Sequence, residues 1–149
     1  MVNDAAGTAV PAQPTGVGRA RVLVVDDSLT VRSYHRMILA AAGFPVREAN
    51  NGYEALELAL AERFDLLLVD VNMPVMDGYS LVEAVRREAL APDVPIIMIS
   101  TEAAAVDLAE AYRRGANLYL VKPADPEQLV RSALLLTGRH PPLARLGVS

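Results

Sequence analysis

The fold of this chain is decided by the stretch Asp65-Leu66-Leu67-Leu68-Val69-Asp70-Val71-Asn72-Met73-Pro74, where an apolar run ends on a carboxylate. An apolar run without polar alternation predicts a strand that is covered on both faces, as in a parallel sheet flanked by helices. Pro74 has no amide hydrogen for a strand ladder, so the strand must end before it. Asp70 is therefore expected at the carboxyl edge of the sheet, where open α/β proteins place their chemistry. This stretch alone leaves a second interpretation open, in which Asp70 only helps to form a turn.

The same alternation of an apolar run and a helical period continues along the chain. Strands are expected over 21–27, 45–49, 65–70, 94–99 and 118–121, and helices over 28–42, 53–64, 78–89, 103–114 and 126–134. The strand at 45–49 is the least apolar and is expected near an edge of the sheet. Five strand–helix units with short links predict an α/β fold, a doubly wound five-stranded parallel sheet with helices on both faces.

Helix ends and inner helix faces are also predicted from residue type. Gly43 and Gly115 are expected to follow the last residues of two helices. Asp77 is expected to be an N-cap, and Asp125 before a proline is a strong start signal. The inward stripes are expected to comprise Leu29, Tyr34, Met37, Ile38, Ala41 and Ala42 on 28–42, and Tyr53, Leu56, Ala59, Leu60 and Phe64 on 53–64.

Composition and charge narrow the class of protein. With 149 residues, 52% of them hydrophobic and 21% charged, the chain is expected to fold as one globular domain. We place this domain at 19–138, after a flexible leader over 1–18 and before a short tail over 139–149. A net charge of −4 without a basic stripe disfavours nucleic-acid binding, and the absence of cysteine excludes disulfides and thiolate metal sites. No apolar run approaches the roughly 18 residues of a membrane span, and no secretory signal is visible, so a cytoplasmic protein without membrane insertion is expected.

Polar residues gather at the carboxyl ends of four expected strands. They are Asp26 and Asp27, Asp70, Ser100, and Lys122. In a parallel sheet these ends share one edge, so three carboxylates come close together and require a raised pKa or a bound cation. Mg²⁺ is the expected cofactor because it takes oxygen ligands, and no His or Cys lies nearby to favour zinc. With Mg²⁺ and Lys122 neutralising phosphoryl oxygens, a carboxylate at this edge is suited to receive a phosphoryl group.

These residues make the sequence similar to the CheY-like receiver domains of two-component response regulators. The motifs that carry the resemblance are Val24-Val25-Asp26-Asp27-Ser28, Leu68-Val69-Asp70-Val71-Asn72-Met73-Pro74 with Met76-Asp77-Gly78, Ile99-Ser100-Thr101-Glu102-Ala103, and Tyr119-Leu120-Val121-Lys122-Pro123. The resemblance covers about Arg19 to Gly138 and implies the flavodoxin-like fold of CheY. Ala124 departs from the family pattern, because a bulky apolar residue usually follows the Lys-Pro pair.

The resemblance implies a role for each residue of the acidic edge. Asp70 is implied to be the phospho-acceptor. Asp27 is implied to bind Mg²⁺ directly and Asp26 largely through water, together with Asp70 and the backbone carbonyl of Asn72. Lys122 is implied to pair with the phosphoryl group, and the bond between Lys122 and the following proline is implied to be cis.

The resemblance also implies a set of switch residues. Ser100, where the family more often has Thr, is implied to be the hydroxyl that binds the phosphoryl group, and Tyr119 the aromatic that moves inward. Asn72 and Glu102 are implied to tune dephosphorylation. The residues themselves leave plainer interpretations open: Ser100 or Thr101 as a helix cap, Tyr119 as an ordinary strand aromatic, and Asn72 as a turn residue.

The resemblance implies a stand-alone response regulator receiver, which is a phospho-acceptor and not an enzyme. The expected donor is a histidine kinase or a histidine phosphotransfer protein. Phosphorylation is expected to switch the face formed by the helix at 103–114, the strand at 118–121 and the helix that follows it, and so to control binding of a downstream protein. The chain is expected to be a monomer that can dimerise when phosphorylated. A single-domain phosphorelay shuttle is the closest alternative.

Two interpretations from other classes are also considered. Haloacid-dehalogenase-like Mg²⁺ phosphatases place an aspartyl nucleophile after a parallel strand, but they carry a second acid two residues later, where this chain has Asn72. The other interpretation is an interaction module of receiver shape that is never phosphorylated. The three acids and the lysine argue against it, because such a module has no need of them. The two histidines, His35 and His140, are expected to be solvated surface residues and neither phosphate donors nor metal ligands.

Overall fold

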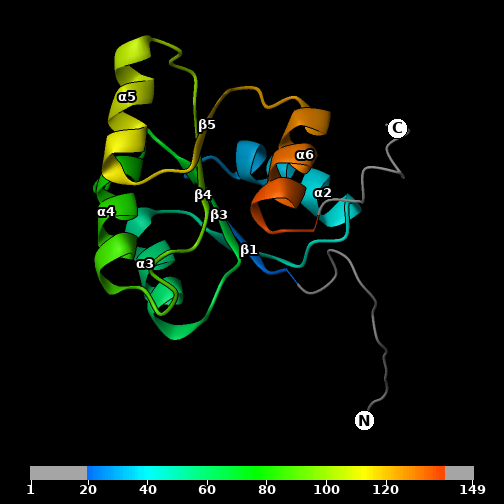
Figure 1. Ribbon diagram of the computed structural model, residues 1–149, viewed down its shortest axis with the longest axis horizontal. Coiled ribbons are helices and arrows are strands. Elements are labelled where there is room, and N and C mark those ends of the chain that lie inside the picture. Colours follow the sequence, from blue (N-terminus) through cyan, green and yellow to red (C-terminus); the bar gives the residue numbers. More distant parts are fainter. Residues whose placement is uncertain (1–19, 140–149) are drawn as a thin grey trace.

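The computed structural model describes residues 20–139 and places one parallel sheet between two layers of helices (Figure 1). The elements are β1 (Val22–Val25), α2 (Leu29–Ala41), β2 (Val46–Ala49), α3 (Gly52–Ala61), β3 (Leu66–Asp70), α4 (Gly78–Glu88), β4 (Ile96–Ser100), α5 (Ala105–Arg114), β5 (Leu118–Val121) and α6 (Pro126–Leu136). The strand order is β2-β1-β3-β4-β5 and every neighbouring pair is parallel. The predicted doubly wound α/β fold is confirmed. The predicted leader at 1–18 and the predicted tail beyond residue 139 lie outside the described residues.

The unbroken apolar runs are explained by burial of the sheet on both faces. Successive residues of a strand point to opposite faces, so a strand covered twice has no polar position. In β1, Leu23 and Val25 pack in the core under α3, α4 and α5, whereas Val22 and Val24 pack in the core under α2 and α6. Figure 1 shows the same division, with α3, α4 and α5 on one side of the sheet and α2 and α6 on the other. The less apolar β2 lies at an edge, as predicted.

The predicted helix ends are confirmed by their hydrogen bonds. Gly43 follows α2 with φ 99°, and its amide donates to Ala40 O at 3.0 Å. Gly115 follows α5 with φ 117°, in the left-handed region that favours glycine. Asp77 and Asp125 cap α4 and α6, where their carboxylates accept the amides three residues later at 2.8 and 3.0 Å. These local signals define where four of the five helices begin or end.

The predicted inward stripe of α2 is wrong in its centre. His35 and Leu39, one helical turn apart, are 1% and 0% exposed, whereas Leu29 and Met37 are 66% and 61% exposed. The apolar residues of α2 outnumber those that one face of the sheet can cover, so periodicity alone does not select the buried ones. The prediction of a solvated His35 is therefore also wrong: its Nε2 is buried without a hydrogen-bond partner among residues 20–139, and burial lowers the pKa of its imidazole. His140 lies outside the described residues.

The inner face of α3 is made by small residues. Ala55 and Ala59 are buried, whereas Tyr53 and Leu60, which were predicted to face inward, are 58% and 46% exposed. Small side chains at the contact let a helix lie close to the elements that it covers. Tyr53 and Leu60 are left toward solvent, whereas Leu58 and the predicted Leu56 are partly buried against the core. None of the helices between residues 20 and 139 has the length and apolarity that a membrane crossing requires.

Arg86 on α4 joins the loop before β4 to the loop before β5. Its guanidinium donates to the carbonyls of Pro92 and Val94 at 2.8 and 2.6 Å and to that of Gly115 at 3.1 and 2.8 Å. It also donates to Asn117 Oδ1 at 2.9 Å, an oxygen that accepts a backbone amide of β4 as well. One planar cation thus satisfies carbonyls that would otherwise be partly buried without a donor.

We expect Arg86→Met to lower the free energy of unfolding by about 2 to 3 kcal/mol, because several carbonyls lose a charged donor at once. Urea denaturation followed by circular dichroism measures this loss. The matched control is Arg87→Met: Arg87 is mostly exposed and, within residues 20–139, pairs only with its neighbour Glu88 at 3.3 Å, so a change within about 0.5 kcal/mol is expected. Equal losses in the two variants would contradict the role of Arg86.

Candidate functional site

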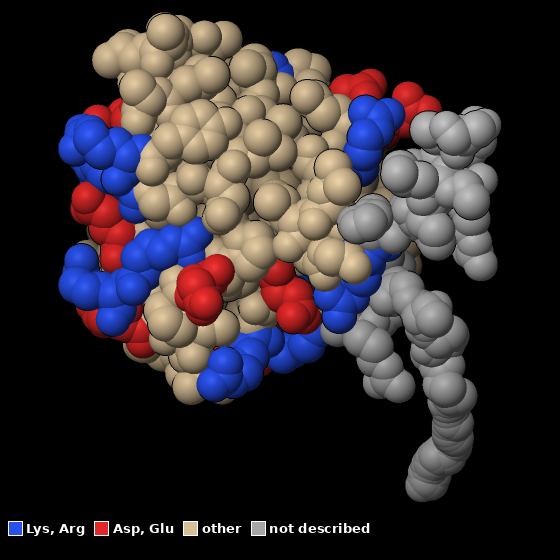
Figure 2. Space-filling model, in the orientation of Figure 1, with Lys and Arg blue, Asp and Glu red and all other residues tan. Residues whose placement is uncertain are grey.

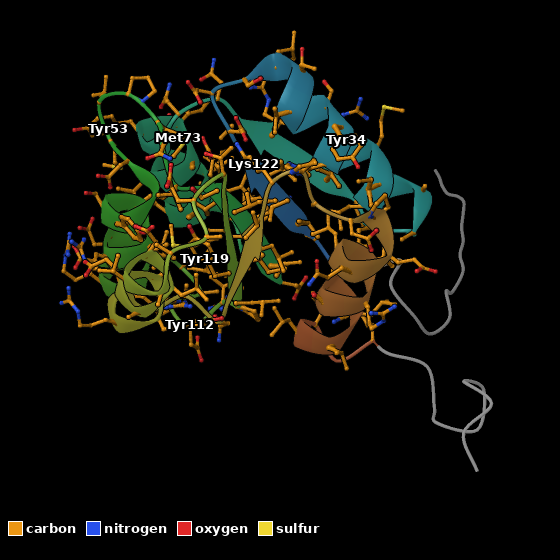
Figure 3. The ribbon with its side chains drawn as sticks, turned by 90° about the horizontal axis from the view of Figure 1, so that it is seen from above. Tyr34, Tyr53, Met73, Tyr112, Tyr119 and Lys122 are labelled. Atoms are coloured by element: carbon orange, nitrogen blue, oxygen red, sulfur yellow. The ribbon has the colours of Figure 1, made fainter. Side chains whose placement is uncertain are left out.

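Four strand ends bring the predicted residues to the upper edge of the sheet in Figure 1. Asp26 and Asp27 follow β1, and Asp70 and Ser100 are the last residues of β3 and β4. Lys122 follows β5, and its amide donates to the Ser100 carbonyl at 2.8 Å. In the view from above, Lys122 lies near the centre of this edge (Figure 3). The predicted gathering at one edge is therefore present.

The three aspartates form a compact acidic cluster. Each offers a carboxylate oxygen, and these oxygens lie within 4.8 Å of one another. Asp26 and Asp70 are 1% and 3% exposed, whereas Asp27 is exposed. Asp26 also accepts the amide of Ser28 at 2.9 Å, which ties its carboxylate to the start of α2. Three oxygens at this spacing suit a hard cation that takes oxygen ligands.

Lys122 compensates part of this negative charge. Its Nζ donates to Asp26 Oδ2 at 3.0 Å and to Asp70 Oδ1 at 2.8 Å. Burial lowers the pKa of the Lys122 ammonium, but the hydrogen bonds to Asp70 and Asp26 outweigh burial, so the pKa lies above its usual value. The bond between Lys122 and Pro123 is cis, as the resemblance implied. The ammonium is therefore held charged between two carboxylates.

Asp70 remains costly to ionise despite this partner. Burial raises the pKa of the Asp70 carboxyl above its usual value. The hydrogen bond from Lys122 opposes the rise, while the charges of Asp26 and Asp27 add to it. One lysine is not enough to balance three acids in a partly buried site, so a further cation is needed to favour the ionised carboxylate.

The predicted switch residues are connected by hydrogen bonds. Ser100 Oγ accepts the Glu102 amide at 3.1 Å and lies 3.5 Å from the side-chain amide of Asn72. The Tyr119 hydroxyl donates to the Glu102 carbonyl at 2.7 Å, and the ring is only 7% exposed. Tyr119 is therefore in an inward position. The interpretation of Ser100 as a helix cap is wrong, because α5 begins at Ala105 with no side-chain cap.

The receiver family accounts for this geometry. The response regulator receiver domain family matches residues 22–134. The chain belongs to this family. A receiver of this family is part of a two-component system, and CheY-like proteins are among its relatives.

Three known proteins are similar to this receiver. The transcriptional regulatory protein PrrA of Mycobacterium tuberculosis is 41% identical over 126 residues, which are 85% of this chain and 53% of PrrA. This chain thus spans about half the length of that relative. The structure of the chemotaxis protein CheY4 of Vibrio cholerae has a TM-score of 0.75 and 41% identity, and the match covers 78% of this chain and 98% of CheY4. The receiver domain of a sensor histidine kinase from Pseudomonas aeruginosa PAO1, solved with a magnesium ion in its active site cleft, has a TM-score of 0.74 and 29% identity over 80% of this chain and 98% of that chain.

The loop after β3 contains features that sequence reasoning missed. The Gly78 amide donates to the Val71 carbonyl at 2.8 Å, and a Cβ on Gly78 would lie 2.3 Å from the Asp70 carbonyl oxygen. Glycine is thus required for the start of α4 to approach the backbone of Asp70. Val75 is 88% exposed with φ 72°, a left-handed conformation that β-branched residues rarely adopt. The motif around Asp77 could have suggested a tight loop, but not this close approach.

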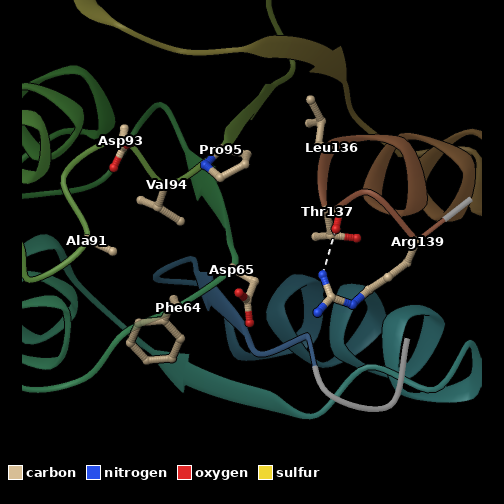
Figure 4. A pocket seen from close by; sticks show the side chains of 9 residues that line it. All are labelled: Phe64, Asp65, Ala91, Asp93, Val94, Pro95, Leu136, Thr137 and Arg139. Carbon is tan, nitrogen blue, oxygen red and sulfur yellow. Dashed lines mark hydrogen bonds between the residues drawn. The ribbon is translucent and has the colours of Figure 1, made fainter. Parts of the chain in front are cut away.

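A hollow lies at the edge of the sheet opposite to the acidic cluster (Figure 4). Its volume is about 260 Å³, and it lies between the starts of β3 and β4 and the end of α6. Asp65 in its wall accepts the amide of Arg21 at 2.8 Å, and Arg139 donates to the Thr137 carbonyl at 2.6 Å. Its polar groups bond to backbone, and it lies at the other end of the strands from the acidic cluster. It contributes nothing to the chemistry of the receiver site.

We expect Asp70→Asn to unfold a few degrees above the wild type at pH 7 in EDTA, because the variant removes a charge that burial makes costly. The folded-state pKa of Asp70 is raised, so this cost is fully present above that pKa. The difference should therefore shrink as the pH falls toward 3.8, the ordinary value for Asp. Calorimetry across pH measures it, with the exposed Asp93→Asn as a control that should not shift. A lower midpoint for Asp70→Asn at pH 7 would mean that the Lys122 bond outweighs burial.

Proposed function

We propose that this receiver accepts a phosphoryl group on Asp70 from a phosphohistidine donor, in a reaction that requires Mg²⁺. The observation that carries the proposal is the Lys122 ammonium, held between Asp26 and Asp70 beside an exposed Asp27. In this arrangement the Lys122 ammonium contacts the proposed acceptor Asp70, and carboxylate oxygens remain to bind a second cation. Magnesium in the active site cleft of the Pseudomonas aeruginosa receiver supports the same use of the cluster here.

The residues present fit a magnesium ion. Asp26, Asp27 and Asp70 would hold it, with the Asn72 backbone carbonyl as a further oxygen ligand. When bound, the ion neutralises phosphoryl oxygens and offsets the mutual repulsion of the acids. An Asp70 oxygen forms the new bond to phosphorus as the bond from phosphorus to the donor imidazole nitrogen breaks, and the electron pair of the broken bond returns to the imidazole. Lys122 balances charge on the phosphoryl group throughout this transfer.

Phosphorylation is proposed to act through Ser100 and Tyr119. A phosphoryl group on Asp70 offers acceptor oxygens to the Ser100 hydroxyl at the neighbouring strand end. Movement of Ser100 changes the backbone at Glu102, which Tyr119 holds by its hydroxyl. Asn72 and Glu102, which both lie at the Ser100 hydroxyl, are proposed to tune how fast the phosphoryl group is lost. Phosphorylation thus shifts the equilibrium between two arrangements of the hydrogen-bonded group formed by Ser100, Glu102 and Tyr119.

The output is proposed to be protein binding by the face of α5, β5 and α6. Figure 2 shows that this side of the molecule is largely uncharged in its middle, with charged residues at its left, lower and upper right edges. Val106, Tyr112, Val121 and Leu135 of these three elements are all at least 43% exposed. Exposed apolar surface rimmed by charge is typical of protein-binding sites. Receivers as a family interact with downstream targets.

The donor is proposed to be a histidine kinase or a histidine phosphotransfer protein that approaches over α2. Leu29 and Met37 of α2 are 66% and 61% exposed, and α2 begins two residues after Asp27. The likeness to CheY4 over 98% of that chain supports a stand-alone regulator. We further propose that the receiver is cytoplasmic and a monomer that can dimerise when phosphorylated. Measuring which purified kinase transfers phosphate fastest would identify the donor.

We propose that the receiver is not an enzyme acting on small phosphoesters. A haloacid-dehalogenase-like mechanism needs a general acid two residues after the nucleophile, and Asn72 provides an amide there. The Asn72 side chain lies near Ser100 Oγ, at 3.5 Å, and its amide is too weak an acid to protonate a leaving alcohol. Sustained hydrolysis of p-nitrophenyl phosphate would revive the phosphatase interpretation.

Acetyl phosphate with Mg²⁺ is expected to add one phosphoryl group, detected by intact mass spectrometry. Asp70→Asn should take up none, because it lacks the nucleophilic carboxylate. Asp107→Asn on α5 serves as the matched control and should be phosphorylated like the wild type. Omitting Mg²⁺ or adding EDTA should suppress the mass shift. A wild type that remains unmodified under all conditions would refute the proposed function.

Mg²⁺ is expected to raise the midpoint of thermal unfolding of the unphosphorylated protein. At a hundredfold excess over its Kd, a ligand that binds only the folded state adds about 2.7 kcal/mol to the free energy of unfolding. Asp27→Asn should lose most of this gain, and Asp93→Asn should keep it. KCl at the same ionic strength controls for screening. The magnesium site as assigned would be wrong if Asp27→Asn were stabilised as much as the wild type.

A further inference from the structure

The Tyr34 hydroxyl connects α2 to the segment that follows Lys122. It donates to the carbonyl of Ala124 at 3.1 Å, across 90 residues of sequence. The Tyr34 ring is 40% exposed, whereas Ala124 is 2% exposed. Figure 3 places Tyr34 on α2 and Lys122 at the centre of the acidic edge. The phenol thus reaches a backbone group two residues after the lysine.

The hydrogen bond spans a hollow region. A cavity of about 540 Å³ lies between α2 and the segment that carries Lys122. Val31, Tyr34 and His35 line it from α2, and Thr101, Lys122 and Pro123 line it from the strand ends. Close packing between α2 and this segment is therefore incomplete beside the lysine, and packing is what normally holds a backbone in one position.

The segment is held by hydrogen bonds on two sides and by the Ala124 methyl group, which packs in the core under α2 and α6. On the sheet side, the Lys122 amide donates to the Ser100 carbonyl at 2.8 Å. On the helix side, the Tyr34 hydroxyl is the side-chain group that bonds the segment within residues 20–139. Ala124 offers only a methyl group for packing, so a hydrogen bond to its backbone replaces contacts that a larger side chain would make.

We propose that Tyr34 is a positioning residue for Lys122: its hydroxyl holds the Lys122–Ala124 segment so that the ammonium stays between Asp26 and Asp70. The lysine contacts are 3.0 and 2.8 Å long, so a small displacement of the backbone weakens both. The kinetic consequence rests on the proposed function, whereas the position of the ammonium does not. Loss of a hydroxyl hydrogen bond should slow phosphorylation roughly three- to tenfold.

The test uses Tyr34→Phe, which keeps the ring and removes only the hydroxyl. Lys122 is the only lysine in the sequence, so protein labelled with ¹³C and ¹⁵N lysine gives one Cε and one Nζ resonance. We expect these chemical shifts to change in Tyr34→Phe and the rate of phosphorylation by acetyl phosphate to fall. Tyr53→Phe, an exposed tyrosine on α3, is the matched control and should alter neither quantity.

Two outcomes separate this proposal from the proposed function. Unchanged lysine shifts in Tyr34→Phe would overturn the positioning role, whatever happens to the rate. Changed lysine shifts in a protein that acetyl phosphate never modifies would support the positioning of Lys122 and refute phosphorylation of Asp70. The Mg²⁺ concentration that gives half of the maximal thermal stabilisation adds a further check. It should be the same in Tyr34→Phe and wild type, because the three acids stay in place.

Discussion

The Lys122 ammonium between Asp26 and Asp70 is the interaction on which the rest of the site depends. Three acids at the end of a buried sheet repel one another, and burial weakens the ability of water to screen them. The lysine reduces this repulsion without removing it, so the site keeps an affinity for one more cation. The acid cluster, and the magnesium ion in the cleft of the Pseudomonas aeruginosa receiver, support the proposal that this cation is magnesium.

This polar edge is possible because the sheet beneath it is rigid and apolar. Every residue of β1, β3 and β4 is buried, with helices packed on both faces. A closely packed sheet holds its strand ends in fixed positions, so carboxylates and an ammonium from distant parts of the chain keep a constant geometry. The same register brings Ser100 beside Asp70 and, through Glu102, connects the acid edge to Tyr119. A change at the edge can therefore reach the face of α5, β5 and α6.

Local sequence signals were reliable where a single residue type has one conformational role. Gly43 and Gly115 adopt the positive φ values that their positions predicted, and Asp125 caps α6. Prediction failed where several residues compete for one buried face. The pattern on 28–42 did not reveal that His35 packs inward while Leu29 faces solvent, because apolar residues on that helix exceed the space under it.

The sequence by itself determined the fold class and the gathering of acids and lysine at one edge. Parallel strands end on the same side, so the order of the motifs is enough to bring Asp26, Asp70 and Lys122 together. Only the tertiary structure decided the contacts that depend on the packing between elements. These are the inward position of Tyr119, the hollow beside Lys122 and the hydrogen bond of Tyr34 that spans it. Such contacts depend on how closely two helices and a loop approach, and no local pattern in the chain encodes that distance.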